Sequence, residues 1–268
     1  PEPPGALPAA PPTPEFAEPD LPHWQALVDT ALAEIGREQF EKVVLCRRVD
    51  LRGSRAFDIG RLLGALGCLY PSCQLINLRR RGKSFVSASP ERLLSLQGRH
   101  LMVDALAGTA PRGATEQEDR YLGELLGRSG KNLREHRHVI DAITASLDDH
   151  CTGIEAPARP AIMRLTNVQH LWSPITATTR PDVNVFQLAE RLHPTPATNG
   201  QPRTAARAWI DRHEPIIRGW YTGAAGVVAP DLTGELWVLL RCARLCADHA
   251  ELYAGAGIVE GSDPLLEW

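Results

Sequence analysis

Two hydrophobic periods alternate along this chain, and they constrain its fold more than any other feature. Residues 42–51 alternate and are rich in β-branched side chains, as in a strand, whereas residues 24–35 place their apolar side chains on one helical stripe. Strand-like segments follow one another at residues 222–230, 234–247 and 250–259. Such blocks, with antiparallel hairpins at the end, predict an α+β (mixed α/β) fold of large, mostly antiparallel sheet layers flanked by helices.

The segments between these blocks keep the same two periods. Further strands are expected at residues 74–80, 84–89, 92–97, 100–106 and 162–178. Further helices are expected at residues 57–70, 115–126, 133–147, 185–192 and 203–213. Thr115 with Glu118, and Asn184 with Gln187, are typical of capping boxes at two helix starts. A glycine-containing loop is expected at residues 107–115.

The composition excludes several classes of protein. Hydrophobic residues make up 43% and charged residues 23% of the 268 residues, which is ordinary for a globular chain. The formal net charge of −3 gives no basic field for nucleic acid, and no apolar run is long enough to span a membrane. The six cysteines form no C-x-x-C pair, which indicates reduced thiols in a cytoplasmic protein.

The first 22 residues differ from the rest of the chain. Residues 1–22 are rich in proline and alanine and lack a hydrophobic period, which is typical of a linker or tail. The chain also starts at Pro1 rather than at a methionine, so we expect a processed chain or a fragment.

Two residues have the chemistry of a general base and a general acid. Lys42 opens an apolar strand; most such lysines lie at a solvated rim, but in a closed site the loss of water favours the neutral amine, a usable base. Glu91 lies between apolar segments, where a carboxyl group tends to stay protonated and can donate a proton. The sequence alone does not bring the two together.

Other charged residues suggest a site for a metal and for a carboxylate. Glu135, at the start of an apolar helical stripe, and Glu267, near the chain end, could supply oxygen ligands to Mg²⁺, although most glutamates lie on solvated faces. Arg241 ends a predicted strand, and Arg218 lies near Tyr221. Such an arginine can bind a carboxylate through two hydrogen bonds or form an ordinary salt bridge.

The glycines of residues 255–261 leave two interpretations open. Their spacing differs by one residue from the dinucleotide-binding fingerprint, and Pro264 follows where a phosphate-binding helix would begin, so a nucleotide site is disfavoured. Either the backbone approaches another ligand closely, or the glycines form a tight turn at a strand end.

These segments together resemble the chorismate-utilising enzymes, most closely the isochorismate synthases. The resemblance covers about residue 23 to the last residue in family order, which makes 23–268 a chorismate-binding catalytic domain. It rests on the stretches KVVLCR, SASPERLL, ALAGTAPRG, KNLREHRHVIDAI, VQHLWSPI, LHPTPA, HEPIIRGWYTGAAG, LRCARL and LYAGAGIVEGSDP.

The resemblance implies a role for each candidate residue. Gly255, Ala256 and Gly257 match main-chain groups that meet a carboxylate of chorismate, so the glycine turn would hold a carboxylate. The other matches follow: Tyr221 and Arg241 bind the enolpyruvyl carboxylate, Glu135 is a ligand of Mg²⁺, Glu267 is a supporting acid beside it, and Thr109 and His170 line the pocket.

Within the family, the chemistry depends on a few positions. Lys42 matches the lysine that activates water for attack at carbon 2, and Glu91 matches the acid that protonates the hydroxyl leaving carbon 4. Ala107 stands where aminodeoxychorismate synthases have a nucleophilic lysine, which disfavours that branch. The resemblance therefore implies an isomerase that converts chorismate to isochorismate with Mg²⁺, in menaquinone or siderophore biosynthesis.

The chain also departs from the family pattern. Thr198 and Asn199 precede Gly200 where a small apolar residue is usual. The usual first hundred or so residues are replaced by the Pro/Ala-rich stretch, and a second Mg²⁺ carboxylate and a lysine beyond Trp268 are absent. We therefore expect a catalytic domain truncated at both ends, with weak or no activity, in a natural protein that continues past Trp268.

Three readings of the function remain open. Isochorismate synthase is the main prediction, with salicylate synthase and a catalytically impaired chorismate-family protein as alternatives. The expected partner is chorismate itself; no nucleic acid, membrane or glutamine amidotransferase subunit is expected.

Overall fold

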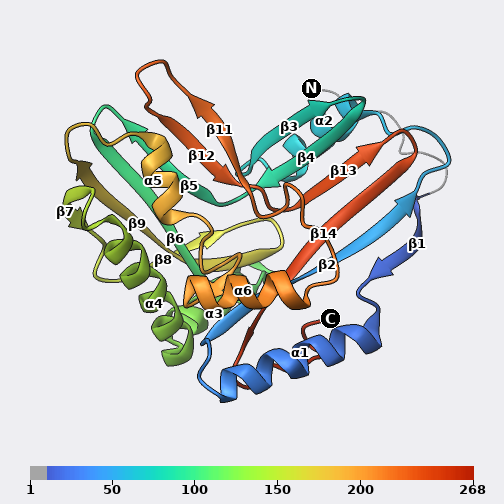
Figure 1. The fold of residues 1–268 in the computed structure, drawn as a ribbon, viewed down its shortest axis with the longest axis horizontal. Helices are drawn as coiled ribbons and strands as arrows, with labels where there is room; N and C mark the ends of the chain where they lie inside the picture. The colour runs from blue at the N-terminus through green and yellow to red at the C-terminus, as the bar shows by residue number, and fades with distance from the viewer. Residues whose placement is uncertain (1–10) are drawn as a thin grey trace. The chain divides into compact units, whose positions relative to one another are not determined.

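The computed structural model describes residues 11–268, and the chain divides by its packing into two compact units. Unit 1 takes the chain up to Ser89 together with Pro194–Gly223 and Leu239–Trp268, and unit 2 takes Pro90–His193 with Ala224–Val238. Each unit contains one seven-stranded sheet, in which every pair of strands is antiparallel, and three helices (Figure 1). The observed architecture therefore confirms the predicted α+β class.

The sheet of unit 1 has the order β1-β2-β14-β13-β4-β3, with β10 also paired to β2. Its strands are β1 (Thr13–Glu18), β2 (Lys42–Arg52), β3 (Gln74–Arg80), β4 (Lys83–Ser89), β10 (Gly200–Gln201), β13 (Cys242–Cys246) and β14 (His249–Val259). The pair β2–β14 runs in register over eleven residues, from Arg52 opposite His249 to Lys42 opposite Val259. This long pair forms the centre of the sheet.

The helices of unit 1 cover one face of this sheet. They are α1 (Leu21–Gly36), α2 (Ile59–Leu69) and α6 (Arg203–His213). Helices α1 and α6 bury Trp24 and Trp209 against Val43, Leu45 and Ile258, which alternate along their strands. Because successive side chains of a strand point to opposite faces, Lys42, Val44 and Cys46 lie on the other face.

The sheet of unit 2 has the order β11-β12-β5-β6-β9-β7, with β8 also paired to β9. Its strands are β5 (Arg92–Gln97), β6 (His100–Pro111), β7 (Cys151–Glu155), β8 (Ala161–Arg164), β9 (Val168–Thr179), β11 (Ala224–Val228) and β12 (Gly234–Val238). Its helices are α3 (Glu116–Arg128), α4 (Gly130–Leu147) and α5 (Val185–Leu192). The buried residues Val139, Ile140 and Ile143 give α4 the apolar stripe that the sequence predicts.

Several segments differ from the sequence-based expectation. Thr13–Glu18, inside the expected linker, forms β1, because β2 offers it a free edge for pairing; residues 1–10 of that linker lie outside the described residues. Residues 107–111 of the expected loop continue β6, with a bulge between Ala107 and Thr109. Gly255–Gly257 lie inside β14 rather than in a turn, and Arg241 lies between β12 and β13 rather than at a strand end.

The two expected helix starts are both present. Asn184 and Gln187 form a reciprocal capping box at the start of α5, as predicted. Thr115 caps α3 by accepting a hydrogen bond from the backbone of Glu118, but the Glu118 carboxylate returns to the backbone of Ala114 instead of Thr115. Both helices still begin at the predicted positions, because the side-chain cap accepts hydrogen bonds from N–H groups of the first turn that have no partner within the helix.

Candidate active site

Lys42 lies at the start of β2, and its side chain runs across Gly257 of the neighbouring strand. A Cβ atom added to Gly257 would lie 2.9 Å from Cε and 3.5 Å from Nζ of Lys42. Lys42 is half-buried, and its strand continues into the buried residues Val43 to Cys46. The absence of a side chain at Gly257 therefore gives the lysine amine its place over β14.

Tyr221 occupies the equivalent position over Gly255. A Cβ atom added to Gly255 would lie 2.5 Å from the Tyr221 hydroxyl oxygen. The Tyr221 ring is buried, stacks on Tyr253 with 5.5 Å between ring centroids, and its burial raises the pKa of the phenol far above its ordinary value. Tyr221 thus stays protonated at neutral pH and can donate a hydrogen bond to an anion over Gly255.

A buried ion pair holds the segment that carries Tyr221. The Arg218 guanidinium donates to both carboxylate oxygens of Glu214 at 2.6 Å and to the carbonyl oxygens of Thr198 and Val44 at 2.8 and 2.6 Å. Glu214 also accepts from the backbone N–H of Cys46 at 3.0 Å. The pair therefore joins the Tyr221 segment to β2, and Arg218 is engaged within the protein.

Residues 198–200 complete this connection on the other side of Lys42. The carbonyl oxygen of Asn199 accepts from the backbone N–H of Val44, and the carbonyl of Gln201 accepts from that of Glu41. Gly200 has φ +134, and a Cβ atom there would collide with the Lys42 carbonyl oxygen. Residues 198–200, which depart from the family pattern, thus lie against the backbone around Lys42 and are hydrogen-bonded to it.

The strand that carries Gly255–Gly257 has an open edge. Along β14, pairing with β13 ends at Tyr253 opposite Cys242, whereas pairing with β2 continues to Val259. Within residues 11–268, no strand pairs with this second edge of β14 beyond Tyr253. Backbone N–H groups at such an edge are available to a ligand.

The strand register puts the backbone of Arg241 next to this open edge. It directly precedes Cys242, so its backbone comes one position after the last β13–β14 pair. Its side chain, however, approaches Cys73, with 3.6 Å between Nη1 and Sγ, and Tyr70, with 5.8 Å from the guanidinium carbon to the ring centroid. The expected approach of Arg241 to a substrate carboxylate stays a prediction.

Glu267 lines a smaller cavity of about 360 Å³ in unit 1, together with Trp24, Arg47 and Ala256. Arg47 and Ala256 alternate with Cys46 and Gly255 along their strands, so this cavity lies on the helix-covered face. The role of Glu267 as a supporting acid likewise stays a prediction.

In unit 2, Glu91 lies in the connection that leads into β5. The residue is 9% exposed, and its backbone carbonyl oxygen accepts a hydrogen bond from the backbone N–H of Val238 at 3.0 Å. The role of Glu91 as a proton donor stays a prediction. Lys42 and Glu91 belong to different units.

Thr109 and His170 form a directly paired set on β6 and β9. Thr109 Oγ1 and His170 Nδ1 are 3.0 Å apart, and the two residues are opposite each other in the sheet. Gly108, which directly precedes Thr109, has φ +73, and a Cβ atom added to it would lie 3.2 Å from Asn132 of α4. The bulge at Gly108 therefore lets the strand approach α4 and presents Thr109, which is exposed.

Glu135 lies on α4, beside a buried histidine. His136 is 1% exposed, its Nε2 lies 2.8 Å from Ser173 Oγ of β9, and burial lowers its pKa below the ordinary value. A neutral His136 thus fixes the helix against the sheet, and Glu135, one residue earlier, lies half-buried on the flank of the helix.

The donor set fits Mg²⁺ only in part. Among residues 11–268, no group of three or more His, Cys, Asp or Glu side chains comes together as a metal cage. Mg²⁺ often takes one or two protein carboxylates and fills its remaining positions with water and substrate oxygens. Glu135 can supply one such carboxylate.

A second buried cluster in unit 2 has no counterpart in the sequence-based prediction. Asp119 of α3 accepts from Arg112 Nε at 2.6 Å, Arg164 Nε at 3.1 Å and the backbone N–H of Gly113 at 3.0 Å. These hydrogen bonds, with that of Arg112 first, lower the pKa of Asp119 to about 2. The cluster anchors the end of β6 to α3 and β8; an arginine after the GTAP stretch was its only signal in the sequence.

No helix among the described residues is both long enough and apolar enough to cross a membrane. The chain is 36% identical over 249 residues to the isochorismate synthase MenF of Bacillus subtilis, which covers 93% of this chain and 53% of that protein. It is 37% identical over 245 residues to the salicylate biosynthesis isochorismate synthase of Pseudomonas aeruginosa. This match covers 91% of this chain and 51% of that protein. The chain thus spans about half the length of these relatives.

The fold matches solved structures closely. The structure of MenF, the menaquinone-specific isochorismate synthase from Escherichia coli, superposes with a TM-score of 0.91 at 33% identity and covers 98% of this chain and 61% of that one. The family described as chorismate binding enzyme matches residues 6–268. With nearly the whole chain matched in sequence and in fold, this protein belongs to the chorismate-binding enzyme family.

Proposed function

We propose that this chain carries the active site of an isochorismate synthase, which converts chorismate to isochorismate with Mg²⁺. The observation that carries the proposal is the Lys42 amine over Gly257, beside the open edge of β14 and the Tyr221 hydroxyl over Gly255. The proximity of Lys42 and Tyr221 to the open edge of β14 supports their proposed roles in base catalysis and anion binding. The similarity to isochorismate synthases at 36–37% identity supports the same assignment.

In the proposed reaction, one water molecule adds at carbon 2 of the ring, and the hydroxyl group at carbon 4 leaves as water. The Lys42 amine acts as the base and takes a proton from a water molecule while the oxygen of that water bonds to carbon 2 of the ring. The ring double bonds shift, the bond from carbon 4 to its oxygen breaks, and protonated Glu91 donates a proton to the leaving hydroxyl. One water enters and one departs, so substrate and product are isomers.

The other residues bind and orient the substrate in this proposal. Tyr221 and the backbone N–H groups at the open edge of β14 donate hydrogen bonds to one carboxylate of chorismate. Arg241 gives this carboxylate a second contact once its side chain has turned away from Cys73. Thr109 and His170 are proposed to contact the substrate. Glu135 would hold Mg²⁺, which supplies charge neutralisation for the ring carboxylate.

The proposal is tested by incubating the protein with chorismate and Mg²⁺ and identifying the products by chromatography. Slow formation of isochorismate is the expected result, in line with the departures from the family pattern, whereas release of pyruvate with salicylate would indicate a salicylate synthase. Chorismate that is bound but left unchanged would indicate a catalytically impaired member of the family and contradict the proposal.

Variants then assign the base and the acid. Lys42→Ala should lower turnover about a hundredfold or more, as loss of a general base does, with a much smaller change in substrate binding. Glu91→Gln should suppress interconversion in both directions, because the amide cannot donate the proton. Lys131→Ala and Glu124→Gln, on the exposed surfaces of α4 and α3, are the matched controls. Near-normal turnover in Lys42→Ala would remove that residue from the mechanism.

A further inference from the structure

Unit 1 contains a second cavity, of about 630 Å³, which is separate from the Lys42 position. Its walls come from β2, β13, β14, the β3–β4 hairpin and residues 217–220. Lys42, Gly255 and Gly257 do not line it; Tyr221 reaches Gly255 and stacks on Tyr253, a wall residue, and so stands between the two. The volume is within the usual range for a small-molecule pocket.

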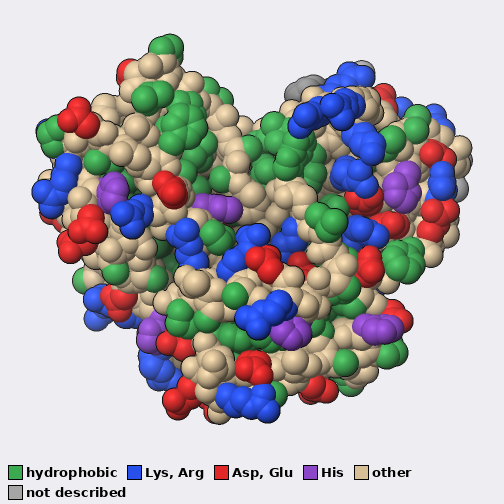
Figure 2. Space-filling view, in the orientation of Figure 1, with side chains coloured by type: hydrophobic (Ala, Val, Ile, Leu, Met, Phe, Trp, Pro, Cys, Tyr) green, Lys and Arg blue, Asp and Glu red, His purple; other side chains and the backbone are tan. Residues whose placement is uncertain are grey.

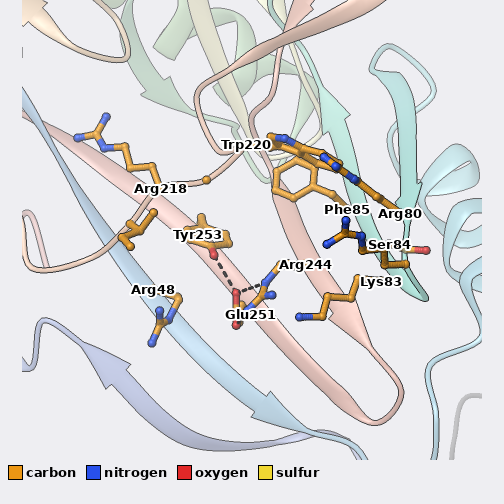
Figure 3. Close-up of a pocket in the computed structure, with 13 residues that line it drawn as sticks. Arg48, Arg80, Lys83, Ser84, Phe85, Arg218, Trp220, Arg244, Glu251 and Tyr253 are labelled. Atoms are coloured by element: carbon orange, nitrogen blue, oxygen red, sulfur yellow. Dashed lines mark hydrogen bonds and ion pairs between the residues drawn. The ribbon is translucent and has the colours of Figure 1, made fainter.

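The walls of this cavity carry an excess of positive charge. Six of the thirteen lining residues are Arg or Lys, against one acid, Glu251. Glu251 is neutralised within the protein, since it accepts hydrogen bonds from the Arg244 guanidinium and from the Tyr253 hydroxyl, as Figure 3 shows. A chain with a net charge of −3 thus concentrates cations at one place.

These cations differ in how far they are already paired. Arg218 is paired with Glu214, Arg244 with Glu251, and Arg48 with Asp50 at 2.9 Å. The three remaining cations, all on the β3–β4 hairpin, form no ion pair with any residue in the range 11–268: Arg80, Arg81 and Lys83. The hairpin therefore provides the charge that an anionic ligand could neutralise.

The hairpin presents this charge at the surface of the unit. Figure 2 shows Lys and Arg side chains gathered over the strands β3 and β4. Arg80 pairs with Lys83, and the two residues between them both have positive φ, at 50° and 76°, as in the tight two-residue turn of a twisted hairpin. The turn therefore brings the backbones of these three residues close together.

Aromatic side chains line the cavity beside the hairpin cations (Figure 3). Phe85 and Trp220 meet edge to face, with 5.7 Å between centroids and 80° between planes. Trp220 is 41% exposed and its neighbour Ile217 is 86% exposed, so apolar surface remains available for a ligand. A flat ring can pack on such a wall while its charged groups reach the hairpin.

We propose that this cavity binds a small planar-ring compound that carries at least two negative charges, with its ring against Trp220 and its anionic groups at Arg80, Arg81 and Lys83. Arginine forks bind phosphates and carboxylates through paired hydrogen bonds. Both a phosphate monoester and a dicarboxylate such as chorismate have this chemistry. The binding site does not depend on the proposed catalytic activity, because it shares neither Lys42 nor Gly255.

The test is a calorimetric titration of the whole chain with phenyl phosphate, which combines a ring with a phosphate dianion. Inorganic phosphate and benzyl alcohol supply the charge alone and the ring alone, and both should bind more weakly. Arg80→Glu should weaken binding of phenyl phosphate about tenfold or more, since a favourable charge becomes a repulsive one. Arg79→Glu is the matched control: it makes the same charge change at the next residue of β3, on its other face.

The expected pattern is a selective loss in Arg80→Glu, with Arg79→Glu within about twofold of the wild type at the same ionic strength. Lys83→Glu is the second variant and should reproduce the loss. A parallel titration with chorismate distinguishes the source. One chorismate site fewer in Arg80→Glu than in the wild type indicates a dicarboxylate ligand, whereas the same number of sites in both proteins indicates a phosphate ligand. Equal losses in Arg79→Glu and Arg80→Glu, or affinity fully matched by inorganic phosphate, would overturn the proposal.

Discussion

At the scale of single residues, two glycines of β14 determine where functional side chains lie. Gly255 and Gly257 alternate along the strand with Ala256, so both face away from the helices. One provides space for the Tyr221 hydroxyl and the other for the Lys42 side chain. Because glycine has no side chain, both positions leave space for a neighbouring side chain, and neither residue has to adopt a turn conformation.

Gly257→Ala should therefore impair turnover more than folding. The new methyl group would lie 2.9 Å from Lys42 Cε, so the amine must move by a few tenths of an ångström or more. A displacement of that order at a reacting group can lower kcat/KM by about tenfold to a hundredfold. Steady-state kinetics with chorismate check this, while the melting temperature reports on folding.

Gly64→Ala is the control for that prediction, since nothing lies within 4 Å of a Cβ atom added to Gly64 on α2. It should retain wild-type turnover and gain slightly in stability, as alanine is the better helix former. Unchanged kinetics in Gly257→Ala would show that the Lys42 amine does not act from this position.

At the scale of elements, the segment between β6 and α3 is anchored by charge. Asp119 binds Arg112, Arg164 and the backbone of Gly113, and is itself 6% exposed. Because β6 also carries Thr109, this anchor fixes the end of a strand that contributes to the candidate site. The element is stabilised by donors from three residues around one carboxylate.

The stability of this anchor should depend on pH in a defined window. The pKa of Asp119 is lowered from 3.8 to about 2, so its contribution is complete above the ordinary value and is lost as the pH falls from about 4 toward about 2. Asp119→Asn should lower the free energy of unfolding at pH 6 and flatten its decline over the acid range. Urea unfolding followed by circular dichroism at a series of pH values measures both effects.

Asp211→Asn provides the comparison, because Asp211 forms an exposed i,i+4 pair with Arg207 on α6. Such a pair contributes little, so this variant should follow the wild-type curve. If Asp119→Asn and Asp211→Asn behaved alike, the anchor would have no special role in stability.

At the scale of the whole molecule, the proposed metal site relies on one carboxylate of α4. No group of three ligating side chains assembles among the described residues, and Mg²⁺ that completes its shell with substrate oxygens should bind well only when chorismate is present. Metal and substrate would then stabilise the fold together.

Thermal unfolding tests this coupling. Mg²⁺ and chorismate together should raise the melting temperature more than the sum of their separate effects, since a ligand at a hundred times its dissociation constant adds about 2.7 kcal/mol. Glu135→Gln should remove the cooperative part and leave the effect of chorismate alone. Glu124→Gln, exposed on α3, should behave as wild type; a persistent cooperative effect in Glu135→Gln would place the metal elsewhere.

The sequence by itself determined most of the elements and the family. Strand and helix periods placed β2, β4, β5, α4 and α6 close to their observed bounds, because each of these segments has one face or both faces buried in its own unit. The ordered stretches from KVVLCR to LYAGAGIV identified the chorismate-binding enzymes, which the match over residues 6–268 confirms.

Only the tertiary structure decided how residues distant in the sequence meet. Lys42 reaches Gly257 because β2 and β14 pair over eleven residues, and no local pattern encodes that register. Arg218 is held by Glu214 and by β2, and Arg80 forms a cavity wall with Trp220, through contacts that a period cannot reveal. The reason is physical: periodicity records which face of a segment is buried, whereas the partner on that face is selected by packing of the whole unit.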